Sequence, residues 1–163
     1  GNGLSVLPVV DDSWQLLGIV TRGSVYSALA ELGTNSQGTT IADSVATAVT
    51  PAPSESAQSA AYTLVTTPMM MNKLGTLSFG VMNEIVNYAV THFLNAQGRR
   101  NVLIEQLSLH AFRPIQLETT IHIAVKTLEL NSHTAVFEVA LSADGMLAAL
   151  ALTTCQLLER TTR

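Results

Sequence analysis

The residues best placed for chemistry lie at the start of one strongly periodic segment, and the first of them is Gly80. The segment from Val81 to Leu94 repeats apolar residues at i, i+1, i+4 and i+5, which predicts a helix that Gly80 opens and Gly98 ends. The first N–H groups of a helix have no partner within it and carry the positive end of its dipole. They could bind an anion or polarise a carbonyl oxygen, and a glycine lets a ligand approach them closely. Alternatively, the backbone angles of a tight turn could require this glycine.

The predicted helix carries one carboxylate, Glu84, and amides at Asn83 and Asn87. At about 100° per residue, Asn83 and Asn87 share one shoulder of the apolar stripe, whereas Glu84 and Thr91 lie opposite the stripe. An amide cannot act as a general base near neutral pH, so Asn87 could only position a water or a ligand. Glu84 could be a base, or it could be a solvated or dimer-facing charge favoured near a helix N-terminus.

Other reactive side chains give weaker signals. Ser78 lacks a G-x-S-x-G elbow and is expected to cap the helix, and Cys155 is expected to pack in the core. The segment Met69 to Met71 could line an acyl channel or pack within a loop. Four histidines lie on different predicted elements without the paired spacing of metal ligands, so we predict neither a metal site nor a cofactor. They are His92, His110, His122 and His133. Three arginines could contact phosphates, namely Arg99, Arg100 and Arg113.

The chain after the helix changes to a period of two, which predicts strands. Apolar residues share one face in each of three predicted strands: Leu103, Leu107, Leu109 and Ala111; Ile121, Ile123 and Val125; Ala135, Phe137, Val139 and Leu141. Asp144-Gly145 predicts a hairpin turn into a last strand from Met146 to Leu158. With another strand at Tyr62 to Pro68, this order predicts an α+β fold in which an antiparallel sheet wraps one long helix.

Composition excludes several classes of protein. Of the 163 residues, 47% are hydrophobic and 12% are charged, where an average domain has about 25% charged residues. A net charge of -4 and scattered basic residues argue against a nucleic-acid partner. The longest apolar stretch, 146–158, is well short of the roughly 20 residues that span a bilayer, so no membrane partner is expected. A single cysteine and the lack of a secretory signal pattern predict a cytoplasmic protein.

The N-terminal part predicts a smaller, separate unit over residues 1–36. Leu4 to Val10 and Leu16 to Thr21 are expected to form a hairpin, and Ser24 could cap a helix that reaches Leu32. So few residues bury too little surface to fold alone. Residues 37–60 are rich in Gly, Ser, Thr, Ala and Pro and are predicted to be a linker before a domain over residues 61–163. Within that linker, one short helix is possible, with Ile41, Val45 and Val49 on one face.

Two segments of the N-terminal unit resemble the second half of a CBS motif, the adenine-nucleotide-sensing module. They are Leu7-Pro-Val-Val-Asp-Asp and Leu17-Gly-Ile-Val-Thr-Arg-Gly-Ser. The family usually has a ribose-binding aspartate where this chain has Ser24. The resemblance therefore implies binding of an adenine nucleotide only through a complete CBS pair. It also indicates that the chain is a fragment of a longer protein whose natural N-terminus lies upstream.

About 100 residues at the C-terminal end resemble the hotdog fold of acyl-CoA thioesterases, including the phenylacetate-pathway and 4-hydroxybenzoyl-CoA types. Those families have an asparagine, a glycine three residues later, a histidine-glycine-glycine that opens the central helix, and an acid seven residues after it. The matching positions here are Asn72, Gly75, Ser78, Phe79, Gly80 and Asn87. Phe112-Arg-Pro and Asp144-Gly-Met-Leu-Ala match later family patterns. The order of CBS and then hotdog segments also resembles bacterial regulators in which a DRTGG domain and a CBS pair precede a hotdog domain.

This resemblance implies a ligand, an assembly and a set of site residues. The ligand is acyl-CoA or a related thioester, and the assembly is a homodimer or a larger homo-oligomer with sites between subunits, which agrees with the apolar composition. The implied catalytic residues are Asn72, Gly80, Glu84 and Asn87. The implied substrate-binding residues are Gly75, Ser78, Phe79, Asn83, Arg113 and Pro114. Two functions stay open: a thioesterase that releases free acid and CoA, and a non-catalytic acyl-CoA sensor within a CBS-containing regulatory or transcriptional protein.

Overall fold

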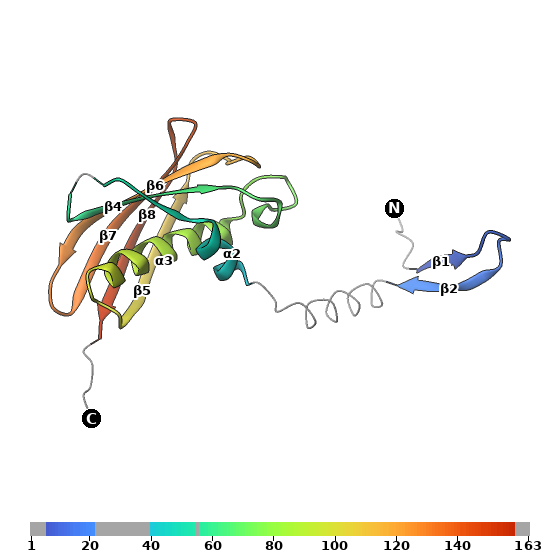
Figure 1. Cartoon of the computed structure of the whole chain (residues 1–163), viewed down its shortest axis with the longest axis horizontal. Coiled ribbons are helices and arrows are strands. Elements are labelled where there is room, and N and C mark those ends of the chain that lie inside the picture. The colour runs from blue at the N-terminus through green and yellow to red at the C-terminus, as the bar shows by residue number, and fades with distance from the viewer. Residues whose placement is uncertain (1–5, 22–39, 55, 159–163) are drawn as a thin grey trace, which may run out of the picture. The chain divides into compact units, whose positions relative to one another are not determined.

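The computed structural model describes residues 6–21, 40–54 and 56–158 and divides the chain into two compact units, residues 1–40 and 41–163 (Figure 1). In the first unit, β1 (Val6–Val10) and β2 (Leu16–Thr21) pair as the predicted antiparallel hairpin. The Asp11 carboxylate shapes the turn, because its Oδ1 accepts hydrogen bonds at 2.9 Å from the N–H groups of Ser13 and Gln15. The helix predicted from Ser24 to Leu32 lies outside the described residues.

The second unit begins earlier than the predicted boundary at residue 61. It begins with α2 (Ile41–Ala48) and β3 (Thr50–Ala52). These elements are part of the folded unit, although the sequence predicted a linker over residues 37–60. Val45 is fully buried and Val49 is 5% exposed, and both belong to the core of this unit. The short helix predicted around them is therefore confirmed. The many small polar residues of the segment suggested a linker, although its few apolar side chains are enough to attach it to the core.

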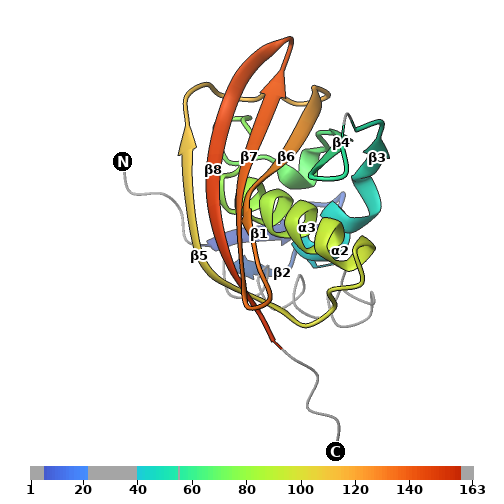
Figure 2. The ribbon, with the colours of Figure 1, turned by 90° about the vertical axis from the view of Figure 1, so that its left-hand side faces the viewer.

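The second unit is an antiparallel sheet that curves around one long helix, as predicted (Figures 1 and 2). Its strand order is β3-β4-β6-β7-β8-β5. The remaining elements are β4 (Ser59–Val65), the short 3-10 helix η1 (Pro68–Met70), α3 (Phe79–Ala96), β5 (Val102–Ala111), β6 (Thr120–Leu130), β7 (Thr134–Ala143) and β8 (Met146–Leu157). Figure 2 shows α3 against the concave side of the sheet with α2 beside it. None of the helices in the described ranges has the length and apolar character of a membrane span.

The alternating pattern correctly predicts which side chains of β6 and β7 face the core. Ile121, Ile123 and Val125 of β6 are each at most 1% exposed, and all the predicted inward residues of β7 are fully buried. The prediction for β5 is partly wrong, because Leu103 is 50% exposed and Ala111 is exposed as well. The register of β5 against β8 shifts between Ile104 and Gln106, and this bulge reverses the alternation of the side chains. Hence Val102 and Ile104 pack against the core before the bulge, and Leu107 and Leu109 do so after it.

The last hairpin has the predicted turn. Asp144 and Gly145 have φ values of 52° and 74°, and positive φ at both central residues is what a type I′ turn requires. The turn leads into β8, which lies between β7 and β5. Burial inside the sheet accounts for the apolar character of β8. The long exposed edge of the sheet is instead β5, which has 10 residues.

The long helix α3 ends where predicted, in a Schellman motif. Gly98 has a φ of 81°, its N–H donates to the Asn95 carbonyl, and the Arg99 N–H donates to the Leu94 carbonyl, both at 3.0 Å. Only a glycine adopts such a φ without strain, so the helix stops at this residue.

Candidate functional site

The loop before α3 is shaped by the side chain of Asn72. Its Oδ1 accepts hydrogen bonds from the N–H groups of Leu74 at 2.9 Å and Thr76 at 3.2 Å. Its Nδ2 donates to the Thr76 hydroxyl at 2.9 Å. Gly75 completes the turn with a φ of 75°, which favours glycine. Both ends of the Asn72 amide are thus engaged within the loop, so its direct effect is on the shape of the loop.

Two backbone hydrogen bonds hold the end of this loop in place just before α3. The N–H of Leu77 donates to the Ile115 carbonyl at 2.8 Å, and that of Ser78 donates to the Met70 carbonyl at 2.9 Å. Ser78 is the N-cap residue, as predicted, but its hydroxyl makes no capping hydrogen bond. The first bond of the helix runs from the Met82 N–H to the Ser78 carbonyl at 3.0 Å.

Three N–H groups at this helix start have no acceptor within the described part of the chain. They belong to Phe79, Gly80 and Val81. Gly80 is exposed, and its φ is not in the positive region that would favour glycine. A Cβ placed on Gly80 would meet only the Ser78 hydroxyl, at 3.8 Å, which is an ordinary contact. The tight-turn explanation for this glycine therefore fails, because neither its backbone angles nor its neighbours require a residue without a side chain.

A cavity of about 350 Å³ opens beside this helix start. It is lined by Asn72, Thr76, Leu77, Phe79, Met82, Ala111, Phe112, Arg113 and Pro114. Four residues predicted from the sequence therefore come together, two from the loop and helix start and two from the segment after β5. That segment is held by the N–H groups of Phe112 and Arg113, which donate to the Ala148 carbonyl at 2.8 and 3.2 Å.

The cavity combines apolar and polar walls. Phe79 is 53% and Phe112 58% exposed, so both rings are available to an apolar ligand. Thr76 and Met82 were not predicted as site residues. Met82 lies in the first turn of the helix whose start was predicted to belong to the site. None of the three methionines from Met69 to Met71 lines this cavity. Met70 is buried in the core and Met71 packs against it, which favours packing over an acyl channel.

Glu84 and Asn87 lie in a second, smaller cavity of about 240 Å³ along α3. The Asn87 Nδ2 donates to Glu84 Oε1 at 3.5 Å, and the Thr91 hydroxyl donates to Asn87 Oδ1 at 3.4 Å. Asn87 therefore shares a face with Glu84, whereas the sequence placed it with Asn83. Helical spacing makes both Asn83 and Glu84 neighbours of Asn87, and the hydrogen bond shows that Asn87 contacts Glu84. The Asn83 side chain instead donates to the Phe79 carbonyl at 2.8 Å.

The structure does not bring the predicted catalytic residues of one chain together. Asn72 lines the first cavity, Glu84 and Asn87 line the second, and Gly80 is among the lining residues of neither. Gly80 and Asn72 are at the helix start, while Asn87 is seven residues beyond Gly80, which is about 10 Å along the axis. The cavity that holds Asn87 contains one carboxylate, that of Glu84, and no lining residue of the first cavity is acidic.

An aromatic cluster borders the second cavity and was not predicted. The Tyr62 hydroxyl lies 3.2 Å from His92 Nδ1, and the Tyr88 ring stacks on His92 with centroids 5.5 Å apart. Burial, with a smaller effect from Tyr88, raises the pKa of Tyr62 to about 12. Tyr62 is 4% exposed and stays protonated at neutral pH. The cluster joins residues 30 positions apart in the sequence, so no local pattern could predict it.

Cys155 is fully buried in β8, as predicted, and it takes no part in either cavity. Burial raises the pKa of its thiol to about 11, with a smaller contribution from Glu105. The thiol is therefore protonated and unreactive at neutral pH, which agrees with a role in packing.

The arrangement of the second unit matches solved structures. Thioesterase superfamily member 2 from Mus musculus has a TM-score of 0.65 and 23% identity, with 83% of this chain and 98% of that chain covered. A hypothetical thioesterase from Streptococcus pneumoniae TIGR4, solved with coenzyme A, has a TM-score of 0.63 and 13% identity, with 70% and 91% covered. The second unit has the hotdog fold. We refer below to the hotdog unit, residues 41–158, whose structural neighbours belong to the thioesterase superfamily.

A sequence relative covers the N-terminal unit as well as the hotdog unit. The chain is 30% identical over 159 residues to YtoI of Bacillus subtilis (strain 168), a protein described as uncharacterized. The match covers 97% of this chain and 36% of YtoI, so the chain spans about a third of that relative. No family model matches the sequence.

Proposed function

We propose that the hotdog unit binds acyl-CoA thioesters at the start of α3 and hydrolyses them to free acid and CoA. The observation that carries this proposal is the set of three N–H groups without acceptors beside a cavity, at Phe79, Gly80 and Val81. A thioester carbonyl oxygen could accept hydrogen bonds from them, and the helix dipole would favour the charge that develops on it. Donors aimed at an oxyanion contribute about 100- to 1,000-fold in rate. The coenzyme A bound to the pneumococcal thioesterase adds support.

The walls of the cavity suit the other parts of such a ligand. Phe79, Met82 and Phe112 offer apolar surface to an acyl chain or to the pantetheine arm of CoA. The Arg113 guanidinium offers donors to a carbonyl or a phosphate, and Pro114 stiffens the segment that carries it. Gly75 and Ser78 act through the loop, since the first forms its turn and the second begins the helix.

Hydrolysis also requires a group that accepts a proton from the attacking water. Glu84 is the only carboxylate on α3, and we propose it for this role. The water oxygen forms a bond to the carbonyl carbon, Glu84 takes the water proton, the C–S bond breaks, and the proton passes to the CoA sulfur. Because Glu84 lies in the second cavity, a second copy of the chain would bring it to the thioester.

A specific observation favours a second candidate function, a non-catalytic acyl-CoA sensor. Asn87 occupies the position of the acid in the resembling thioesterases, and an amide cannot replace a general base, whose loss costs about 100- to 10,000-fold. As a sensor, the hotdog unit would bind acyl-CoA without hydrolysing it, and the larger protein would respond to the bound ligand. The resemblance of the N-terminal unit to half a CBS motif fits such a regulator. Its described strands leave large apolar side chains exposed, including Leu7 at 59% and Leu17 at 69%, as expected of a half that needs its pair.

We expect the hotdog unit to form at least a dimer. The edge strand β5 has 10 residues and leaves one side of its backbone without a partner strand, and such edges are usually covered. Leu103 on this strand is also half exposed. Sedimentation of the full chain at tens of micromolar should therefore give the mass of a dimer or a larger assembly. A single monomeric species would contradict this expectation and the sharing of Glu84 between copies.

Gly80→Val tests the thioester site directly. A branched side chain would crowd the three N–H groups, and we expect acyl-CoA binding measured by calorimetry to weaken by at least about tenfold. Ala96→Val is the matched control, because it adds the same side chain to the exposed opposite end of α3. It should leave binding unchanged. Equal affinity of Gly80→Val and the unaltered chain would show that the helix start is not the binding site.

A further inference from the structure

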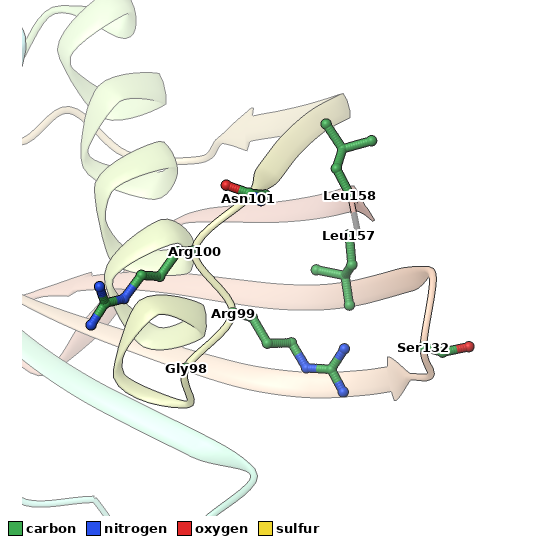
Figure 3. Close-up of a pocket in the computed structure, with 7 residues that line it drawn as sticks. All are labelled: Gly98, Arg99, Arg100, Asn101, Ser132, Leu157 and Leu158. Carbon is green, nitrogen blue, oxygen red and sulfur yellow. The ribbon is translucent and has the colours of Figure 1, made fainter. Parts of the chain in front are cut away.

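A third cavity, of about 550 Å³, lies at the C-terminal end of α3 (Figure 3). Its side-chain lining consists of Arg99, Arg100, Asn101, Ser132, Leu157 and Leu158. It is distinct from the proposed thioester site, which lies at the other end of the helix. The 18 residues of α3 separate the two by about 27 Å.

Backbone hydrogen bonds fix each wall of this cavity. The Schellman motif holds Arg99 through its N–H, which donates to the Leu94 carbonyl at 3.0 Å. The Leu158 N–H donates to the Asn101 carbonyl at 2.9 Å, which ties the start of β5 to the chain after β8. Asn131 shapes the turn that carries Ser132, since its Oδ1 accepts from the N–H groups of His133 and Thr134. The cavity is therefore preorganised by three separate segments of the fold.

No described side chain balances the arginine charge in this cavity. Within the described residues, the side chains of Arg99 and Arg100 have no ion pair or hydrogen bond, and no carboxylate lines the cavity. The nearby Glu129 lines a different cavity and accepts a hydrogen bond from Asn131 Nδ2 at 3.1 Å. Figure 3 shows Arg99 extending toward Ser132 and Leu157, whereas Arg100 extends to the other side of the loop. Arg99 is the principal cation of the site.

A positive charge after a helix C-terminus also interacts favourably with the helix dipole. That effect does not require a cavity beside Arg99. A guanidinium has five donors in a planar fork, which suit a planar or tetrahedral oxyanion. Figure 3 shows Asn101 and Ser132 on opposite sides of Arg99, with their side-chain oxygens turned away from it. Leu157 and Leu158 add apolar surface to the cavity.

We propose that this cavity binds the phosphoryl group of a phosphorylated small molecule. Arg99 would hold two phosphate oxygens in the paired geometry that guanidinium groups favour. The leucines would contact the less polar part of the ligand. This inference does not depend on thioester chemistry at the opposite end of α3.

Calorimetric titration of the full chain with inorganic pyrophosphate tests the proposal. We expect saturable binding that weakens as salt is added. Arg99→Gln should weaken it by about 10- to 100-fold, because hydrogen bonds to charged groups are the strong ones. Lys126→Gln, which removes one positive charge from β6, is the matched control and should leave binding unchanged. Thermal unfolding of each variant checks that it is folded.

Two further arms identify the source of the phosphate and separate this site from the thioester site. Displacement of pyrophosphate by coenzyme A would assign the phosphoryl group to that molecule, and lack of displacement would assign it to another phosphorylated compound. Gly80→Val should bind pyrophosphate normally even if it loses acyl-CoA. No saturable binding, or an equal loss in Arg99→Gln and Lys126→Gln, would overturn the proposal.

Discussion

Replacing Asn87 with aspartate should raise acyl-CoA hydrolysis by about 100- to 10,000-fold, the contribution expected of a general base, if the hotdog unit lacks a working base as in the sensor candidate. The substitution places a carboxylate where the resembling thioesterases have their acid. The Asn87 amide donates to Glu84 Oε1 at 3.5 Å, so the new carboxylate would stand beside an existing one. Repulsion between two neighbouring carboxylates raises the pKa of one of them. The gain should therefore increase with rising pH, which a pH–rate profile of Asn87→Asp will show.

The matched control for this prediction is Asn83→Asp. Asn83 is on the same helix, but it bonds to the Phe79 carbonyl and lines neither of the two cavities along α3 that we describe. It should leave the rate near that of the unaltered chain. If instead the unaltered chain already hydrolyses acyl-CoA rapidly, Glu84→Gln abolishes that activity, and Asn87→Asp adds nothing, then Glu84 is the working base and the sensor candidate is wrong.

Phe137→Ala should destabilise the hotdog unit by about 3–5 kcal/mol, the cost of deleting a buried aromatic ring. Phe137 is fully buried on the inner face of β7. Its ring meets Phe93 of α3 edge to face, with centroids 5.8 Å apart and planes at 84°. The pair thus links the sheet to the helix that carries both proposed cavities, so loss of the ring removes packing and leaves a void.

Denaturant unfolding measures this cost, and Leu152→Ala provides the control. Leu152 is 47% exposed on β8, so its truncation should change the free energy of unfolding far less. A loss below about 1 kcal/mol in Phe137→Ala would mean that the sheet and α3 do not share one tightly packed core.

The sequence predicted the fold well where periodicity is regular. The helical period from Val81 to Leu94 and the alternation in β6 and β7 each gave the correct buried face. The β5 bulge was not predicted, because one inserted residue reverses the alternation without changing the composition. The attachment of α2 was missed for a different reason. Its Ala, Ser and Thr content resembles a linker, and Val45 is buried only because the rest of the unit supplies a surface.

The candidate site could be predicted only in part. The resemblance to thioesterase motifs predicted that Asn72, Phe79, Arg113 and Pro114 belong to one site. All four line the same cavity in the structure. The bonding of the Asn72 side chain depends on the path of the loop, so its role in shaping that loop was not evident. The pairing of Asn87 with Glu84 follows from spacing on the helix, but which side of α3 stays open depends on how the sheet covers it.

The central claim is that the hotdog unit binds acyl-CoA thioesters at the start of α3, and titration calorimetry of the full chain tests it most directly. The panel should run from short to long acyl groups and include an aryl-CoA, with hydrolysis of each compound followed alongside. We predict saturable binding of at least one acyl-CoA and its loss in Gly80→Val, whether or not turnover accompanies it. Absence of both binding and hydrolysis across the panel, or binding that Gly80→Val leaves intact, would contradict the claim.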